Sequence, residues 1–530
     1  MFQKRRSFSQ RIGFAWFALL FGLLVYPPRS PGAQLSLTNA PTTAIPGGVP
    51  GSGEDLARRV CSGCHQFPEP NLLDRTTWER EILPRMEARL GITPPDYSSS
   101  PEGELLKRLE LYPKEPLIPQ RDWDAIVAYY LAHAPATPLP QEPRPEIQIG
   151  LPLFRFEPAR FRFLPALTTL VQISPMSRRI YLGDDQARQL AILDSRGQSI
   201  GTLALDNVAV GATETTNGLY VTCVGSFLPS EVQRGALLFF PREKDGFGPR
   251  RVIVDRLPRA AQTEFADLDG DGDVDFAMCL YGNHRGRFSW FRNLGGDRYQ
   301  EEILIEKSGA IHCLARDING DGSIDLSLLM AQENETFQVF RNLGRGEFQS
   351  EHVFQRPPVY GHNYFELTDF DGDGIEDLLV ANGDNGEFTS PPKRFHGLRI
   401  YRGQGGGRFQ ESAAWFFPLN GATKALARDF DEDGDLDIAA ISFFPDYERS
   451  PRESFVYLEN RGPWTFAPAT FQQCIAGRWL TLDAGDLDGD GDLDLALGSY
   501  VRGPTAVPGF LTQSWEKDGP SVVILRNQLR

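Results

Sequence analysis

The chain has 530 residues and a formal net charge of −16 at pH 7. This length is too great for one compact core and indicates two or three domains, one of them large enough for a closed all-β fold. The acidic residues crowd into short aspartate-rich runs in the C-terminal half, which argues against a nucleic-acid-binding protein because phosphate contacts need clustered Lys and Arg.

The N-terminal segment, residues 1–33, has the order of a secretory signal peptide. Basic residues between Lys4 and Arg11 precede an apolar run (12–26) and a stretch of small residues that ends near Ala33. An uncleaved membrane anchor is the alternative, since no clean small-residue cleavage motif follows the apolar run. We expect an exported bacterial protein, periplasmic or at the cell surface, from which the signal is removed.

Composition divides the next part of the chain into three segments. Residues 34–52 are rich in Pro, Gly, Thr and Ser and are expected to form a flexible linker. Residues 53–134 show a helical pattern, which ends in an apolar stripe within 123–131. The proline-rich residues 135–152 can form neither a helix nor an inner strand, so a semi-stiff spacer between domains is predicted there.

The helical segment contains the CxxCH motif Cys61, Ser62, Gly63, Cys64, His65. This spacing suits covalent haem attachment, in which two thiols add to the haem vinyl groups and the adjacent His binds the iron. The alternative is a redox or zinc CxxC, but zinc needs two further ligands and the remaining cysteines lie outside this segment. The segment resembles the class I cytochrome c family over about eighty residues, which implies one haem c held by Cys61, Cys64 and His65.

The sixth iron ligand has two candidates. Met86 is the only methionine of the predicted haem domain, and a Met ligand would raise the reduction potential. It stands closer to the CxxCH motif than in most of the family. His133, at the end of the last predicted helix, is the other candidate, and an open or different coordination is the third possibility.

Four further cysteines lie in or beside strand-like apolar runs: Cys223, Cys279, Cys313 and Cys474. They are predicted to be buried thiols, with one disulfide left open.

From residue 153 onward, short strands rich in Val, Ile, Phe and Tyr recur at a period of roughly fifty to sixty residues. A strand, turn and second strand occur seven times, but the last copy stops at Arg530 before its second strand. The strand-like segment 154–165 has no repeat of its own. A ring in which this first strand completes the last blade accounts for both ends. Residues 153–530 are therefore predicted to form an all-β, seven-bladed propeller.

Five of these repeats contain a nine-residue aspartate loop. Side-chain oxygens fall at positions 1, 3, 5 and 9, position 7 can offer its backbone carbonyl, and a Gly at position 6 allows the tight turn. This is the spacing of a calcium loop, although the distant Glu and the flanking helices of an EF-hand are missing. The predicted ligand positions are Asp267, Asp269, Asp271, Asp273, Asp275; Asp317, Asn319, Asp321, Ser323, Asp325; Asp369, Asp371, Asp373, Ile375, Asp377; Asp429, Asp431, Asp433, Asp435, Asp437; and Asp486, Asp488, Asp490, Asp492, Asp494.

Solvated hairpin turns without metal are the alternative explanation for a single loop of this kind. Five copies in register argue against it, since so many converging carboxylates would repel one another without a cation. Folding is therefore expected to be linked to calcium.

These repeats resemble the FG-GAP or VCBS repeats of integrin α-like β-propellers over roughly residues 155 to 530. The resemblance implies a seven-bladed propeller with about five Ca²⁺ ions and no particular reaction. Two of the seven repeats lack the loop, so metal-free first blades are expected.

Polar residues near the starts of the predicted innermost strands form a last set of candidates: His312, His362, Lys424 and Arg478. Such positions surround the mouth of a propeller channel, where ligands commonly bind, although ordinary polar loop residues are the simpler explanation.

The sequence thus predicts a multidomain protein, a small all-α cytochrome c domain followed by an all-β seven-bladed propeller. Its expected function is electron transfer to a redox partner protein or small electron carrier, while the propeller binds a protein or polysaccharide. The alternative is a haem-linked dehydrogenase that oxidises a small molecule or sugar in the propeller pocket. No nucleophile with a base partner and no nucleotide-binding glycine loop is visible in the sequence, which favours the first.

Overall fold

A computed structural model provides the structure of the protein and describes residues 51–333, 335–385, 391–503 and 507–530. The predicted signal peptide and nearly all of the following linker lie outside these residues. In the part of the chain that the structure describes, no helix has the length and apolar character needed to cross a bilayer.

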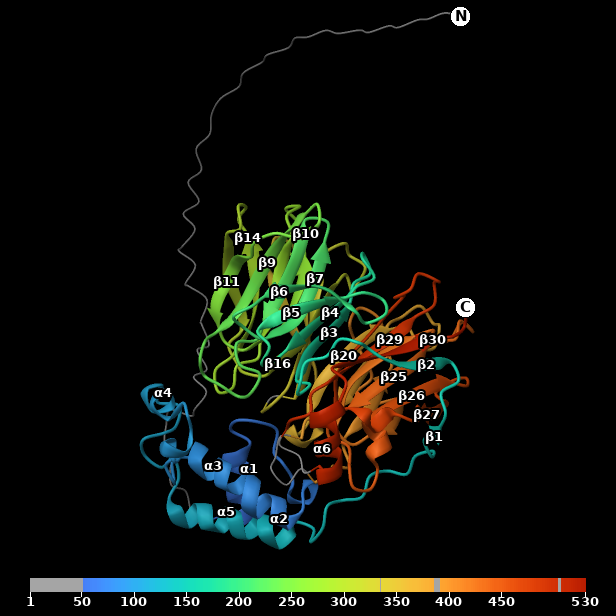
Figure 1. Ribbon diagram of the computed structural model, residues 1–530. Coiled ribbons are helices and arrows are strands. Elements are labelled where there is room, and N and C mark those ends of the chain that lie inside the picture. Colours follow the sequence, from blue (N-terminus) through green and yellow to red (C-terminus); the bar gives the residue numbers. More distant parts are fainter. Residues whose placement is uncertain (1–50, 334, 386–390, 504–506) are drawn as a thin grey trace, which may run out of the picture. The chain divides into compact units, whose positions relative to one another are not determined.

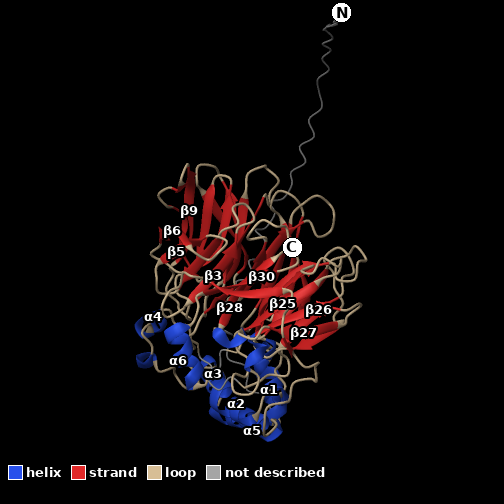
Figure 2. Cartoon of the chain, turned by 45° about the vertical axis from the view of Figure 1, so that its right-hand side comes forward, coloured by secondary structure: helices blue, strands red, loops and turns tan. Residues whose placement is uncertain are grey.

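Helices dominate the segment before the proline-rich stretch, whereas strands dominate the rest of the chain (Figure 2). The first helix begins with a capping box, in which the Ser52 hydroxyl accepts the Asp55 N–H and the Asp55 carboxylate accepts the Ser52 N–H. The helical elements are α1 (Gly53–Cys61), η1 (Pro70–Leu72), α2 (Arg75–Thr77), the π-helical turn η2 (Trp78–Ile82), α3 (Leu83–Arg89), η3 (Tyr97–Ser99), α4 (Gly103–Arg108) and α5 (Gln120–His133).

Helices α1 and α5 pack closely against each other. A Cβ atom added at Gly53 would lie 2.4 Å from the Ala125 carbonyl oxygen, so only glycine permits this approach. Val60 of α1 and Ile126 and Tyr130 of α5 belong to the same buried apolar cluster. This packing fixes the end of α1, where Cys61 lies.

The remaining chain forms seven sheets arranged as the blades of a propeller, as predicted, and their strands are antiparallel except for one short strand at the edge of blade 6 (Figure 1). Blades 1 to 3 are β3 (Thr168–Ile173), β4 (Ile180–Asp184), β5 (Gln189–Leu193), β6 (Ser199–Ala204); β7 (Ala209–Thr215), β8 (Gly218–Cys223), β9 (Gly235–Glu243), β10 (Gly246–Phe247), β11 (Arg251–Leu257); and β12 (Ala260–Ala266), β13 (Asp275–Leu280), β14 (Arg287–Asn293), β15 (Tyr299–Ile305).

Blades 4 to 6 are β16 (Ala310–Arg316), β17 (Asp325–Met330), β18 (Thr336–Asn342), β19 (Phe348–Gln355); β20 (His362–Thr368), β21 (Asp377–Asn382), β22 (Gly397–Tyr401), β23 (Trp415–Pro418); and β24 (Ala422–Arg428), β25 (Asp437–Ser442), β26 (Phe455–Asn460), β27 (Phe466–Thr470). Blade 7 contains β28 (Trp479–Gly485), β29 (Asp494–Ser499) and β30 (Val522–Asn527). Helix α6 (Gly509–Asp518) is inserted between β29 and β30, and short 3-10 turns lie at η4 (Pro358–Tyr360), η5 (Pro451–Ser454) and η6 (Cys474–Ala476).

The ring is closed by β2 (Phe154–Pro158), which supplies the fourth strand of blade 7. It runs antiparallel to β30, with Phe154 opposite Asn527 and Pro158 opposite Val523 (Figure 1). This confirms the predicted closure and removes the open edge that the last blade would otherwise present.

The proline-rich segment also joins the propeller. Its short strand β1 (Gln148–Ile149) pairs in parallel with the outer strand β27 of blade 6, and Arg144 lies 2.5 Å from Glu453. The segment is therefore an edge strand of blade 6 as well as a connection, which proline tolerates because an edge strand needs only half of its backbone groups paired.

Side chains on the innermost strands connect neighbouring blades. The Gln262 side-chain oxygen accepts the Cys313 N–H at 2.7 Å, and the Asp483 carboxylate accepts the Ile173 N–H at 2.7 Å. Innermost strands have one free edge, so these side chains satisfy backbone groups that no neighbouring strand reaches. The second strands of the seven blades are almost entirely buried, because adjacent blades cover both of their faces.

The helical segment and the aspartate loops lie at opposite ends of the propeller. Antiparallel strands place the loops between second and third strands, and those between blades, at one end. The helical segment contacts this end, where Arg89 lies 3.0 Å from Glu333 and the Glu102 carboxylate accepts the Glu231 N–H at 2.8 Å. The aspartate loops join first and second strands and therefore lie at the other end.

Candidate functional site

The five aspartate loops lie between the first and second strands of blades 3 to 7. In four of them, three carboxylates bring one oxygen each to within 4.8 Å of one another. These groups are Asp267, Asp269, Asp271; Asp369, Asp371, Asp377; Asp429, Asp431, Asp433; and Asp486, Asp488, Asp490. The blade 4 loop has no such group of three carboxylates among the described residues, and its position 3 is the amide Asn319.

The carboxylate at position 1 shapes each loop from inside. In blade 3, Asp267 accepts the N–H of Gly270 at 2.8 Å and that of Gly272 at 3.0 Å. Both glycines have positive φ, which only glycine adopts at little cost. The loop thus has its turn defined by the protein alone, as a preformed cation site requires.

The carboxylate at position 9 anchors the loop to its blade. Asp275 is fully buried, and it accepts the Leu268 N–H at 3.0 Å and the Asn293 N–H at 2.7 Å. Burial raises the pKa of Asp437 to about 7 and that of Asp494 to about 6 at the same position. The position 9 carboxylate therefore has a structural role in addition to the ligand role that the sequence predicts.

An asparagine at the end of the third strand was missed by the sequence analysis. It occurs in four of the five blades, as Asn293, Asn342, Asn460 and Asn527. The Asn527 amide donates to the Leu493 carbonyl of its own loop at 3.2 Å and to the Phe430 carbonyl of the preceding loop at 2.8 Å. The sequence could have revealed this role, because the asparagine recurs after an apolar third strand. The contacts of Asn527 also connect neighbouring loops.

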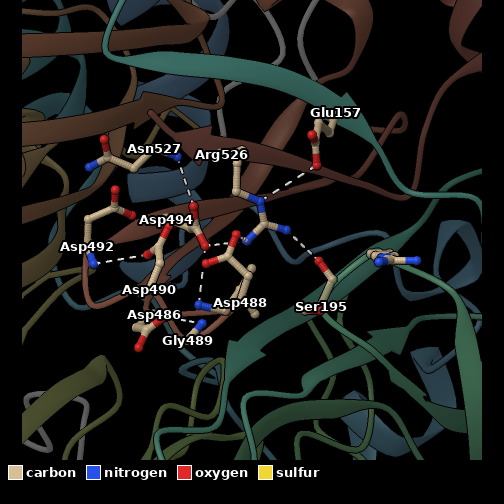
Figure 3. A network of polar contacts seen from close by, with 12 residues as sticks. Glu157, Ser195, Asp486, Asp488, Gly489, Asp490, Asp492, Asp494, Arg526 and Asn527 are labelled. Atoms are coloured by element: carbon tan, nitrogen blue, oxygen red, sulfur yellow. Dashed lines mark hydrogen bonds and ion pairs between the residues drawn. The ribbon is translucent and has the colours of Figure 1, made fainter. Parts of the chain in front are cut away.

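The blade 7 loop shows why a cation fits these sites (Figure 3). Asp492 is 1% exposed; its Oδ2 accepts the Arg530 N–H at 3.2 Å, but its Oδ1 has no hydrogen-bond partner among the described residues. The Oδ1 atoms of Asp371, Asp429 and Asp435 are also buried without a hydrogen-bond partner among the described residues. A buried acceptor without a donor is costly, and a hard cation that takes oxygen ligands would satisfy it.

The CxxCH segment begins at the last residue of α1. Cys61 is half-buried and Cys64 is exposed, and both are free thiols. Burial raises the pKa of Cys61 to about 11. The His65 Nδ1 lies 2.9 Å from the Gln66 carbonyl oxygen, an arrangement that leaves Nε2 for a metal.

An apolar cluster lies against the first residue of this segment, whereas Ser62, Gly63 and Cys64 are exposed. Cys61 and Met86 both pack against the cluster formed by α1 and α5, and the propeller contributes Tyr360 and Phe395, whose stacked rings are 5.1 Å apart. The other candidate ligand, His133, is exposed, and its Nδ1 lies 2.8 Å from the Tyr129 carbonyl. The donor set and its apolar surroundings are compatible with a haem group.

The four remaining cysteines are buried free thiols, and the described residues contain no disulfide. Burial raises the pKa of Cys223 to about 12.

Two of the four predicted channel residues lie together on innermost strands. The His312 ring stacks on Tyr364 with centroids 4.4 Å apart, and Lys424 Nζ lies 4.9 Å from the same ring. Burial, with a smaller effect of Lys424, lowers the pKa of His312 to about 3, so the imidazole is neutral.

The other two are buried in contacts with the protein. The His362 N–H donates to Glu335 at 2.6 Å, and its Nδ1 lies 3.0 Å from the Met330 carbonyl. The Arg478 Nε donates to the Phe443 carbonyl at 3.2 Å. These two side chains therefore stabilise the fold and do not line an open channel mouth.

Comparison with known proteins places the repeats in a family. The model of the FG-GAP-like repeat matches residues 267–328, 317–380, 369–440 and 429–497. No curated protein matches the sequence.

Similar solved structures include two of "BBS1N in complex with ARL6DN", soaked with lead and with mercury. Their TM-scores are 0.42 and 0.41 at 9% identity, and they cover 72% and 71% of this chain and 97% of the other chain. The N-terminal domain of Nup159 has a TM-score of 0.40 at 10% identity and covers 73% of this chain and 99% of the other. On the match of the repeats and the geometry of the seven sheets, the chain carries FG-GAP-like repeats within a seven-bladed β-propeller.

Proposed function

We propose that this protein is an exported, periplasmic or cell-surface c-type cytochrome with one haem, whose calcium-stabilised propeller binds a partner or ligand. The observation that carries the haem assignment is the CxxCH segment at the end of α1, with an imidazole whose Nδ1 faces a backbone carbonyl. In this proposal Cys61 and Cys64 attach the haem and His65 binds its iron. The haem, when bound, supplies a one-electron carrier.

The surroundings of the motif support this role. Tyr360 and Phe395 of the propeller pack, partly buried, against the same apolar cluster as Cys61 and Met86. An apolar shell of this kind raises the reduction potential of a bound redox centre. We assign Met86 as the sixth ligand, since it packs against the same cluster as Cys61.

The calcium assignment rests on the four groups of converging carboxylates and on the buried oxygens that lack a donor. FG-GAP-like repeats cover these loops, and five loops correspond to about five ions. The propeller then serves as a rigid binding platform. A protein or polysaccharide is its proposed ligand, and a redox partner protein or small electron carrier exchanges electrons with the haem.

Intact mass and absorption spectra of the secreted protein test the haem assignment. We expect the polypeptide mass plus one haem and a c-type spectrum that survives acid extraction. The Cys61→Ser, Cys64→Ser double variant should lose the covalent haem, while Cys223→Ser is a matched control that should keep it. An unmodified mass in the wild-type protein would disprove the haem assignment.

Calcium is tested separately by metal analysis after dialysis against calcium-containing buffer. We expect about five ions per chain, and no retained or titratable calcium would refute this part of the proposal. The Met86→Ala variant tests the sixth ligand, because it should lose the methionine–iron absorption band at the red end of the spectrum.

A further inference from the structure

The five aspartate loops differ in one residue that faces them from the third strand. At the end of each third strand, one backbone N–H donates to the aspartate at loop position 9. The residue that differs is the one directly before this donor in the sequence. In blades 3, 4, 5 and 7 it is arginine, as Arg292, Arg341, Arg402 and Arg526. In blade 6 it is Glu459.

Three of the arginines contact acidic residues of their own loop. Arg292 lies 2.6 Å from Asp269, and Arg402 forms an ion pair with Asp371. Asp269 and Asp371 occupy position 3 of their loops. In each case the guanidinium supplies a positive charge and donors where a cation would bind.

Blade 7 has the strongest compensation of this kind (Figure 3). Arg526 is 6% exposed and lies 2.5 Å from Asp494 and 3.3 Å from Asp488. Arg178 of blade 1 adds a third contact, 3.5 Å from Asp486. In blade 4, Arg341 pairs instead with Glu351, 2.9 Å away, and that loop has Asn319 in place of a carboxylate.

The five ligand-position aspartates of the blade 6 loop have no such compensation among the described residues, although Arg530 pairs with Glu432 at position 4 of this loop. In the described part of the chain, no Lys or Arg side chain contacts any of its five ligand-position aspartates. The Asp429 and Asp435 Oδ1 atoms are buried and have no hydrogen-bond partner there. Glu459 stands at the same strand position, directly before Asn460, and so brings a carboxylate where the other blades have a guanidinium; it pairs with the exposed Arg461 at 2.6 Å.

Position 4 of the same loop also differs from the other four loops. The other four loops have glycine there, but blade 6 has Glu432 with a φ of 57°. A side chain in this left-handed region carries a conformational cost. The Glu432 carboxylate is paired with Arg530 at 2.5 Å, so it adds no net charge to the loop.

We propose that the third-strand residue facing each loop sets the calcium affinity of that loop. This residue is Arg292, Arg341, Arg402, Glu459 or Arg526, and Glu459 makes blade 6 the tightest site. This inference rests on the proposed calcium binding. An ion that enters blades 3, 5 or 7 must displace or tolerate a guanidinium, whereas an ion that enters blade 6 meets an added carboxylate. Blade 6 is therefore the site that stays filled when calcium is scarce.

Calorimetric titration of the chelator-stripped, full-length secreted protein with CaCl₂ tests this ranking. Glu459→Arg should weaken the tightest class of sites by about ten-fold, since two units of charge change beside a divalent ion near the surface. Asp431→Asn should remove one ion from that class. The reciprocal Arg292→Glu should strengthen one of the weaker sites.

The matched control is Glu448→Arg, which makes the same change of charge on an exposed residue between β25 and β26, at the other end of the propeller. It should leave the tightest class unchanged. Glu459→Gln, which removes only the charge, gives a smaller weakening and serves if the arginine variant fails to fold. If Glu459→Gln and Glu459→Arg both bind as wild type, or if Asp431→Asn spares the tightest class, the ranking is wrong while calcium binding stands. If no form of the protein binds calcium, the proposed calcium sites and the ranking both fail.

Discussion

Two aspartates of the blade 3 loop have different predicted roles, and replacing each by asparagine separates calcium binding from folding. Asp271 is exposed, belongs to the converging carboxylates and accepts the Asp273 N–H at 2.9 Å. Asp275 is buried and accepts two backbone N–H groups, from Leu268 and Asn293. Asparagine can replace Asp271 with its hydrogen bond intact, but at position 275 it has one acceptor for two donors.

The cost of Asp275→Asn follows from these contacts. One charge-assisted hydrogen bond becomes neutral and one buried N–H loses its acceptor, each at about 1–3 kcal/mol, so the free energy of unfolding should fall by about 3 kcal/mol. Spread over the roughly 380 residues of the propeller, this lowers Tm by about 4 °C. The loss should be present in chelator as well as in calcium.

For Asp271→Asn we expect Tm in chelator to equal or slightly exceed that of wild type, because one repelling carboxylate is gone. In calcium its Tm should be lower than that of wild type. Differential scanning calorimetry at one scan rate, with and without chelator, gives all four values. If Asp275→Asn is no more damaging than Asp271→Asn in chelator, the anchoring role of position 9 is wrong.

Further predictions concern calcium, the ring seam, the helix pair and pH. Chelation should lower the Tm of the propeller by about 9 °C if calcium stabilises the five sites by about 1.4 kcal/mol on average, the value for a site filled at ten times its Kd, and calorimetry showing no shift would contradict the linkage. In chelator, Arg526→Leu should lower the free energy of unfolding by about 3–5 kcal/mol in denaturant titrations, because Asp494 is left buried without a cation; the exposed Arg345→Leu is the control. Gly53→Val should destabilise the helical segment by about 1–3 kcal/mol or more, since its Cβ would lie 2.4 Å from the Ala125 oxygen, and an unchanged unfolding curve would count against the close approach. Burial raises the pKa of Glu264 to about 7, so the folded protein binds this proton more tightly than the unfolded chain does. The protonated carboxyl therefore contributes its full stabilisation below about pH 4, and this contribution is lost as pH rises through 7. In saturating calcium, Glu264→Gln should therefore flatten the fall of Tm between pH 5 and 8, and parallel profiles would refute this.

The fold could be predicted from the sequence where a local residue pattern is compatible with only one structure. The aspartate spacing predicted the loops, and the unpaired strand-like segment 154–165 predicted the ring closure, in which residues 154–158 form β2. Both predictions follow from short-range geometry and the number of strands. The four cysteines of the propeller are buried thiols, as their apolar surroundings indicated.

Contacts between residues that are distant in the sequence could not be predicted from local patterns. His362 and Arg478 were candidates for a channel mouth, with ordinary polar residues as the simpler explanation, and each is buried in contacts with backbone carbonyls or with Glu335 from another part of the fold. The proline-rich spacer pairs with β27, more than three hundred residues later, and nothing in its own composition indicates that partner. The anchoring asparagines could be counted in the sequence, but their reach into the preceding loop depends on how the blades are stacked.

The closing strand β2 has a consequence for how the ring is completed during synthesis. Its residues leave the ribosome long before β30, the strand with which they pair. Until β30 emerges, β2 must wait without a partner, and the half-built last blade presents an unpaired edge on which other chains can add strands. A nascent or truncated chain is therefore most prone to aggregate at this seam, and the final assembly step joins the two ends of a long loop in the sequence, a slow event for which the loss of chain entropy is greatest.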